Sequence, residues 1–187
     1  MELTRNNTAA TVLELSDLKD HLSVDGSDSD TVITACQRAA VDMIERETNT
    51  QVGPGQYTLV TDFPQSRADI VLPKPPLVSV ESVTFTAPDG TSLTLEPDVF
   101  RVSTSRPGRL VLRPGRSWPT TAGGGAVTIV YTSGNDLGQV PEALLHCVRL
   151  LTGHFFDNRE GTSTLTIKEV PLAVASIVNQ FRFVEAV

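Results

Sequence analysis

The sequence has few of the residues and runs that mark disulfide-bonded, metal-binding or membrane proteins. It contains two cysteines and three histidines in 187 residues. Cys36 and Cys147 each fall on the apolar stripe of a predicted helix, so we expect buried free thiols; a disulfide or a ligand pair is the alternative. No apolar run approaches the ~20 residues that span a bilayer, and the N-terminus lacks the basic-then-apolar pattern of a signal peptide. We therefore expect no membrane partner, and a chain that stays in the cytoplasm where it is made.

Motifs of catalysis and of cofactor binding are also missing. There is no Gly-x-Ser-x-Gly elbow and no His-Glu-x-x-His pair. His146 and His154 lie on one predicted helix about 80° out of register, which argues against a shared metal, and we expect His146 in the core. The glycines at 123–125 lack the Lys-Ser/Thr of a phosphate loop, and residues 23–29 lack the ligand pattern of a calcium loop. The sequence predicts no enzyme, no cofactor and no metal.

Charge is unevenly spread along a chain of net charge −7. Nine acidic residues stand between Glu14 and Glu47, against only Lys19, Arg38 and Arg46. The segment 99–119 has no acid and carries five arginines: Arg101, Arg106, Arg109, Arg113 and Arg116. They can contact phosphates or a partner, or can simply flank the two edges of a hairpin. The acidic balance argues against tight DNA binding and suits a wall past which DNA slides.

Apolar residues at three- and four-residue spacing predict two long helices, at 30–48 and 140–160. The second is apolar over so much of its circumference that we expect it to be central, with room for a neighbouring subunit on one side. Shorter helices are predicted at 17–22, with Ser16 as the N-cap, and at 172–183. Residues 1–12 are expected to be frayed.

Between the long helices the pattern changes to short extended segments separated by turns. Strands are predicted at 56–61, 69–72, 78–86, 91–95, 99–103, 109–112 and 126–132. Such short strands at this density indicate a compact antiparallel barrel or sandwich. We therefore predict an α+β fold, a small helical bundle with a β barrel or sandwich inserted between the second and third main helices. Residues 1–187 are expected to form a single domain, with a helical core at 14–50 and 140–183 and an insert at 56–132.

Four passages together carry a family resemblance. They are LKDHLSVDG at 18–26 before a long helix, LPKPPLVSV at 72–80, Pro107-Gly108-Arg109 followed by Trp118-Pro119, and VPEA at 140–143 through the helix end NRE at 158–160. In this order, and over most of the chain, the sequence resembles the head-tail connector, or adaptor, proteins of long-tailed double-stranded DNA bacteriophages and gene transfer agents.

The resemblance implies a structural virion protein at the head-tail interface, present in the host cytoplasm during assembly. Family members form a ring, which we expect to be dodecameric, beneath the portal protein. The ring extends the DNA channel and presents a surface to a head-completion stopper or tail protein. DNA is expected to pass through without sequence-specific binding.

Two sets of residues are candidates for these contacts. We expect Phe181, Arg182 and Phe183 to dock on the portal, with the aromatic rings in pockets and the guanidinium on a carboxylate; a tail that folds back on its own core is the alternative. We expect the five arginines of 101–116 to contact a neighbouring ring.

Two other functions remain open from the sequence. A nucleic-acid-binding accessory of DNA packaging would place the same arginines on phosphates. A ligand-binding module, for carbohydrate as one example, would use Trp118 and Tyr131.

Overall fold

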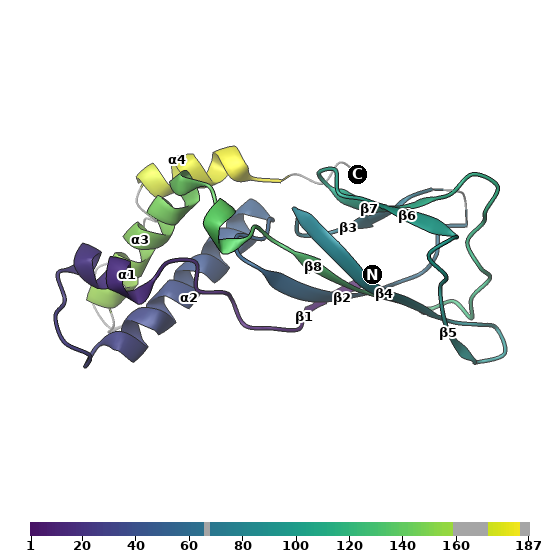
Figure 1. The fold of residues 1–187 in the computed structure, drawn as a ribbon, viewed down its shortest axis with the longest axis horizontal. Helices are drawn as coiled ribbons and strands as arrows, with labels where there is room; N and C mark the ends of the chain where they lie inside the picture. Colours follow the sequence, from purple (N-terminus) through teal and green to yellow (C-terminus); the bar gives the residue numbers. More distant parts are fainter. Residues whose placement is uncertain (66–67, 159–171, 184–187) are drawn as a thin grey trace. The chain divides into compact units, whose positions relative to one another are not determined.

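The computed structural model describes residues 1–65, 68–158 and 172–183 (Figure 1). Its contacts group into two compact units. The strands lie in a sheet unit, residues 1–8 and 54–134, and the helices lie in a helical unit, residues 9–53 and 135–187. The fold is thus α+β, with antiparallel sheets inserted between α2 and α3, which confirms the predicted class.

The helical unit is held together by one apolar core. Its elements are α1 (Leu15–Leu22), α2 (Asp30–Thr48), the short 3-10 helix η1 (Leu137–Gln139), α3 (Glu142–Asp157) and α4 (Leu172–Phe181). The buried stripe of α2, with Ile33, Ala40 and Ile44, belongs to the same core as Val148 and Leu151 of α3. The bounds of α2 are those expected from its periodicity, because a long amphipathic helix carries its pattern within its own sequence. No helix in the described ranges is both long enough and apolar enough to cross a membrane.

The start of α1 differs from the prediction. Its N-cap is Glu14, and Ser16 lies inside the first turn. At the other end Ser23 adopts a left-handed conformation with φ 54°, and its N–H donates to the Asp20 carbonyl. Lys19 then reaches across the turn to Asp30, with 2.8 Å between Nζ and Oδ1. This ion pair ties the end of α1 to the start of α2.

The sheet unit contains two antiparallel sheets. One has the strand order β1-β2-β8-β4-β5, and the other has the order β3-β7-β6. Their bounds are β1 Glu2–Arg5, β2 Gly55–Thr61, β3 Ile70–Leu72, β4 Leu77–Thr86, β5 Ser92–Thr94, β6 Phe100–Ser103, β7 Gly108–Leu112 and β8 Val127–Ser133. Residues of both sheets, among them Leu59, Ile129, Leu72 and Leu110, share one buried core. The described strands therefore form an open sandwich and do not close into a barrel.

Strand β1 was not expected from the sequence. Residues 2–5 pair with β2 along their whole length, and Leu3 packs against the core of the unit. The Asn6 side chain extends the contact by donating to Gln56 Oε1 (3.1 Å) and by accepting from the Thr58 hydroxyl (3.0 Å). A four-residue polar segment has too little pattern of its own to be recognised, because its order depends on a partner about fifty residues away.

Two turns of the sheet unit are fixed by carboxylates. The predicted turn at 88–90 is present, and the Asp89 carboxylate accepts the Thr91 N–H at 2.9 Å, which lowers the pKa of Asp89. The glycine-rich tip at 123–125 is anchored because Asp62 accepts the N–H groups of Gly125 (2.9 Å) and Ala126 (3.1 Å).

Candidate assembly surfaces

The C-terminal end of α4 folds back on the helical unit. Phe181 is half-buried against the helical core, and the Phe183 N–H donates to the Thr48 carbonyl at the end of α2 (2.7 Å). Arg182 between them is exposed. The residues proposed for docking thus differ in their exposure. Phe181 already packs against the core of its own unit, whereas the Arg182 side chain faces solvent.

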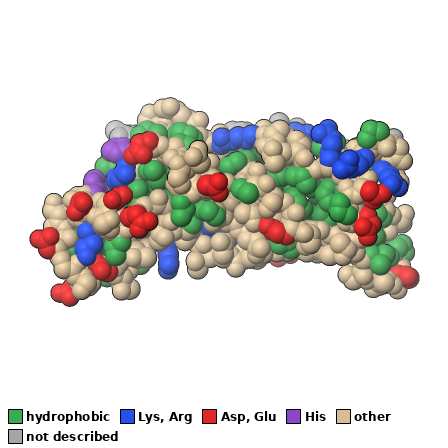
Figure 2. Space-filling view, in the orientation of Figure 1, with side chains coloured by type: hydrophobic (Ala, Val, Ile, Leu, Met, Phe, Trp, Pro, Cys, Tyr) green, Lys and Arg blue, Asp and Glu red, His purple; other side chains and the backbone are tan. Residues whose placement is uncertain are grey.

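The five arginines of 101–116 surround the hairpin of β6 and β7. Figure 2 shows Lys and Arg side chains gathered over the part of the sheet unit that Figure 1 labels β6 and β7. Arg101 lies in β6 and Arg109 in β7, Arg106 lies in the turn between them, and Arg113 and Arg116 follow β7. The structure therefore brings the five predicted residues to one region of the unit.

Three of these arginines stabilise the sheet unit itself. Arg109 lies 3.8 Å from a carboxylate oxygen of Asp69, and Arg116 pairs with Asp98. Arg113 donates from Nε to the Phe100 carbonyl at 3.0 Å. Both acids lie outside the acid-free segment, so inspection of that segment alone could not find them. Arg101 differs, because its exposed side chain makes no hydrogen bond or ion pair with any residue in the described ranges.

The acidic stretch 14–47 is not entirely a solvated face. Glu45 is only 3% exposed, and its carboxylate accepts the Val52 N–H at 3.0 Å. Asp42 pairs with Arg46 one turn along α2 at 3.0 Å. Glu45 is therefore structural, because it holds the segment that follows α2, and Asp30 and Asp42 are paired with Lys19 and Arg46.

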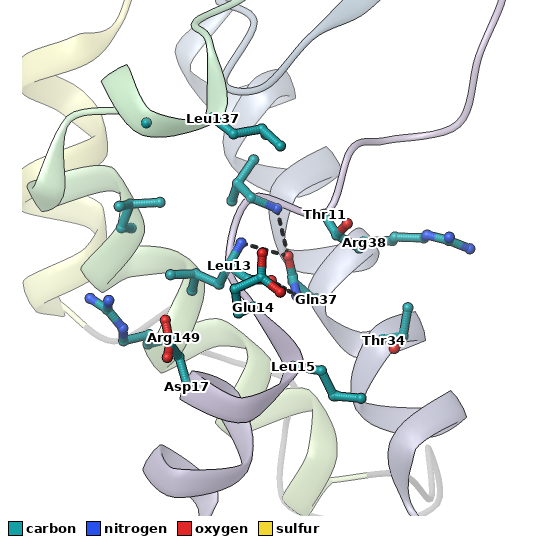
Figure 3. A pocket seen from close by; sticks show the side chains of 13 residues that line it. Thr11, Leu13, Glu14, Leu15, Asp17, Thr34, Gln37, Arg38, Leu137 and Arg149 are labelled. Carbon is teal, nitrogen blue, oxygen red and sulfur yellow. Dashed lines mark hydrogen bonds between the residues drawn. The ribbon is translucent and has the colours of Figure 1, made fainter.

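A hollow of about 590 Å³ lies in the helical unit, at a place where the sequence pattern predicted no site. Figure 3 shows it between the segment before α1, the helices α2 and α3, and η1. Gln37, 2% exposed, accepts the N–H groups of Val12 (2.7 Å) and Leu13 (3.1 Å) through Oε1 and donates to the Leu13 carbonyl (3.1 Å). On another side Arg149 pairs with Glu142 at 2.7 Å.

The charges around this hollow are mixed. Glu14 and Asp17 line it together with Arg38 and Arg149, and Figure 3 shows the Arg38 side chain extending away from the centre. Leu137, 52% exposed, adds an apolar group at the rim. With both signs present, the hollow has no preference for an anion or a cation.

The described histidines and cysteines do not gather into one site. Cys36 and Cys147 do not form a disulfide; Cys147 is fully buried as expected, whereas Cys36 is only half-buried. His146 is exposed, so the prediction that it lies in the core is wrong. It is the neighbour of the buried Cys147 in the sequence, but it lies on the opposite, exposed side of α3. Within the described ranges, no three His, Cys, Asp or Glu side chains gather in a way that could hold a metal ion.

Burial raises the pKa of the Cys147 thiol, which gives a direct test of the core. Because the thiolate is the reactive form, we expect maleimide to label Cys147 at least about tenfold more slowly than Cys36 in the folded protein. In urea the two rates should become equal. Mass spectrometry of the labelled peptides measures both, and equal rates in the folded protein would contradict the packing of α3.

The aromatic pair considered for ligand binding is used inside the sheet unit. Tyr131 is fully buried, and its hydroxyl donates to the Pro73 carbonyl at 3.0 Å. Trp118 stacks on Phe63 with 5.0 Å between ring centroids and donates from Nε1 to the Ala68 carbonyl at 3.1 Å. A carbohydrate site built on Trp118 and Tyr131 is therefore wrong, because no sugar can reach the Tyr131 ring.

The solved structures that are similar to the whole chain include three from gene transfer agent particles. They are chains described as the neck of an empty gene transfer agent particle computed with C6 symmetry (TM-score 0.82), the virion of a native gene transfer agent particle (0.80) and the neck of a native particle computed with C12 symmetry (0.78). Each is 20% identical in sequence and covers 100% of this chain and 98% of its own. No curated protein matches the chain.

A family model described as head completion protein matches residues 11–184. The match includes α1 to α4 and seven of the eight strands, so it extends over both units. The similarity inferred from the four short passages is thereby confirmed at the level of the family. The chain therefore belongs to the head completion protein family.

Proposed function

We propose that the chain forms a ring in the neck of a virion, beneath the portal, where it extends the DNA channel and joins head to tail. The observation that carries this proposal is the family match over residues 11–184, together with a fold similar along its whole length to chains from gene transfer agent necks. Two of those necks were computed with C6 and C12 symmetry, which supports a ring of twelve copies for this chain.

The charge distribution supports a channel function. The helical unit contains 15 acidic and seven basic residues, a net charge of −8, whereas the sheet unit contains seven and eight, a net charge of +1. A negative wall repels phosphates and lets DNA pass without adhering. Such a ring would need no covalent chemistry, because closed symmetry repeats the same weak interface between every pair of neighbouring copies.

We propose the tail of α4 as the contact with the portal. Phe181, Arg182 and Phe183 follow one another at the end of the helix, and Arg182 presents its charge to solvent. Aromatic and arginine side chains are the common anchors of protein interfaces. The loops that carry Arg106, Arg113 and Arg116, with Arg109 beside them, are proposed to face a neighbouring ring, whose contact surface we expect to be acidic.

The first experiment measures the mass of the purified chain by light scattering, alone and mixed with the portal protein of the same particle. We expect a ring, or a monomer that assembles only on the portal. Arg182→Glu should weaken portal binding about tenfold or more, because the variant loses an anchor without touching the helical core. Arg38→Glu, an equal change of charge on an exposed residue of α2, is the control.

Two outcomes would contradict the proposal. A chain that remains monomeric with the portal is no ring component. Portal binding unchanged in Arg182→Glu, and also unchanged after removal of residues 181–187, would exclude the tail as the contact. Affinity for DNA that falls steeply with salt would favour the nucleic-acid-binding accessory instead, although three of the five arginines are already engaged within the sheet unit.

A further inference from the structure

Four described strands of the sheet unit lie at a sheet edge: β1 and β5 end the five-stranded sheet, and β3 and β6 end the three-stranded sheet. We propose that β1 of one copy adds to β6 of the next copy, so that the sheets of neighbouring subunits join within the ring. This inference rests on the proposed function, since it requires a second copy. A ring contact is heterologous and needs two different surfaces that fit one another, which these two edges provide.

The edge of β6 exposes part of the core of the unit. Val102 lies opposite Leu110 of β7, which is fully buried, so both side chains point to the core face. Val102 is nevertheless 40% exposed, because no strand in the described part of the chain pairs with the outer edge of β6. An added strand with an apolar residue at this position would cover it.

The two edges carry opposite charges. Glu2 of β1 and Arg101 of β6 are both exposed, and neither side chain has a hydrogen-bond or ion-pair partner in the described ranges. The neighbouring charges are engaged: Arg5 lies over the Tyr57 ring and Arg113 binds the Phe100 carbonyl. Each edge thus offers one uncompensated charge, of opposite sign.

The backbone hydrogen bonds fix which residues can pair. The backbone N–H of Arg113 donates to the Val99 carbonyl, so the backbone groups of residues 99, 101 and 103 form hydrogen bonds with β7. The backbone N–H and carbonyl groups of Phe100 and Val102 therefore point to the free edge of β6. The backbone N–H of Asn6 donates to the backbone carbonyl of Gln56, so the backbone groups of residues 2 and 4 form hydrogen bonds with β2. Leu3 and Met1 consequently turn their polar groups to the free edge of β1.

One antiparallel register satisfies these conditions together. It places Leu3 opposite Phe100 and Met1 opposite Val102, which joins the outward N–H and carbonyl groups of the two edges. Leu3 and Phe100 both pack toward a core, so the core faces continue from one copy to the next. Arg113 takes one lone pair of the Phe100 carbonyl and leaves the second.

In the same register Glu2 lies opposite Arg101 on the outer face. They form a narrow, non-hydrogen-bonded pair, in which the Cβ atoms of facing residues are about 5 Å apart. Met1, 77% exposed in the single chain, covers the exposed Val102. The pairing therefore satisfies charge, backbone polarity and apolar burial at once.

A charge swap tests this pairing by light scattering or native mass spectrometry of the ring, on the portal if the ring needs it. Glu2→Arg and Arg101→Glu each place like charges across the contact, and we expect each to weaken assembly about tenfold, because the repulsion recurs at every interface. The double variant restores opposite charges and should recover assembly. Asp25→Arg and Arg38→Glu make the same charge changes on exposed residues of the helical unit and serve as controls.

Disulfide trapping tests the register independently. In a chain with Cys36→Ser and Cys147→Ala, the pair Glu2→Cys and Arg101→Cys should form intersubunit disulfides upon oxidation, seen as a ladder of multimers on a non-reducing gel. In the pair Glu2→Cys and Ser103→Cys, the second cysteine lies on the same face of β6 but two residues beyond the position opposite residue 2. This pair should form far fewer intersubunit disulfides.

The outcomes separate this inference from the proposed function. A ring that ignores both single charge reversals, and forms no disulfide ladder, overturns the strand pairing while the proposed function stands; Arg101 then only protects an edge strand from unwanted pairing. A wild-type chain that forms no ring, alone or with the portal, overturns both.

Discussion

Replacing Gly108 with alanine is expected to lower the free energy of unfolding of the sheet unit by about 2–3 kcal/mol. Gly108 begins β7 and lies under Leu77 of β4, so it is a point where the two sheets meet. A Cβ atom there would lie 2.5 Å from the Leu77 Cβ and 2.6 Å from its Cδ2. Because Leu77 is only 5% exposed, its side chain has no free space to enter, and the sheets must separate locally.

Urea unfolding followed by Trp118 fluorescence measures this effect. Trp118 is the single tryptophan and stacks on Phe63 within the sheet unit, so its emission reports that unit. Gly138→Ala is the matched control, since no atom lies within 4 Å of its added Cβ, and it should shift the midpoint little. Overlapping curves for Gly108→Ala and the wild type would show that Leu77 moves aside without cost, contrary to the close packing described.

Gln37→Leu is expected to destabilise the helical unit by about 3–4 kcal/mol, because it leaves three buried backbone groups without a partner. Those groups are the N–H of Val12 and both the N–H and the carbonyl of Leu13. Leucine has nearly the size of glutamine, so the packing is retained and the loss reports the hydrogen bonds. The variant should release the segment before α1, which leads from the sheet unit into the helices.

Circular dichroism at the helical minimum, recorded against urea, measures the change. Arg38→Leu alters the adjacent exposed residue of α2 and should shift the stability by no more than about 0.5 kcal/mol. Equal stability of Gln37→Leu and the wild type would mean that water replaces the amide, which would make the hollow beside Gln37 a hydrated site rather than a dry contact.

The local pattern of the sequence was sufficient for the helices and most strands. The bounds of α2 agree because its buried stripe repeats every three to four residues. The seven predicted strands agree to within one or two residues because glycine and proline turns separate them. The family was also recognised from the sequence, because the four passages that carry the resemblance are short local patterns in a fixed order.

The partners of individual side chains could not be predicted in the same way. Arg109 and Arg116 find acids 40 and 18 residues away in sequence, and Glu45 is buried by the segment after α2. His146 stands next to a buried cysteine but on the exposed side of α3. Which charges are available to a partner, and which are already used, follows only after the chain has folded.

The sequence by itself thus determined most of the elements, the α+β class and the family, since periodicity, turn residues and short motifs are encoded within a few turns of chain. Tertiary structure alone decided that residues 2–5 form a strand and that Tyr131 is closed to ligands. It also decided that Glu2 and Arg101, at the edges of β1 and β6, have no charged partner among the described residues. The reason is physical: hydrogen-bond pairing across a sheet, burial and ion pairing depend on residues far apart in the chain, and these meet only in the packed fold.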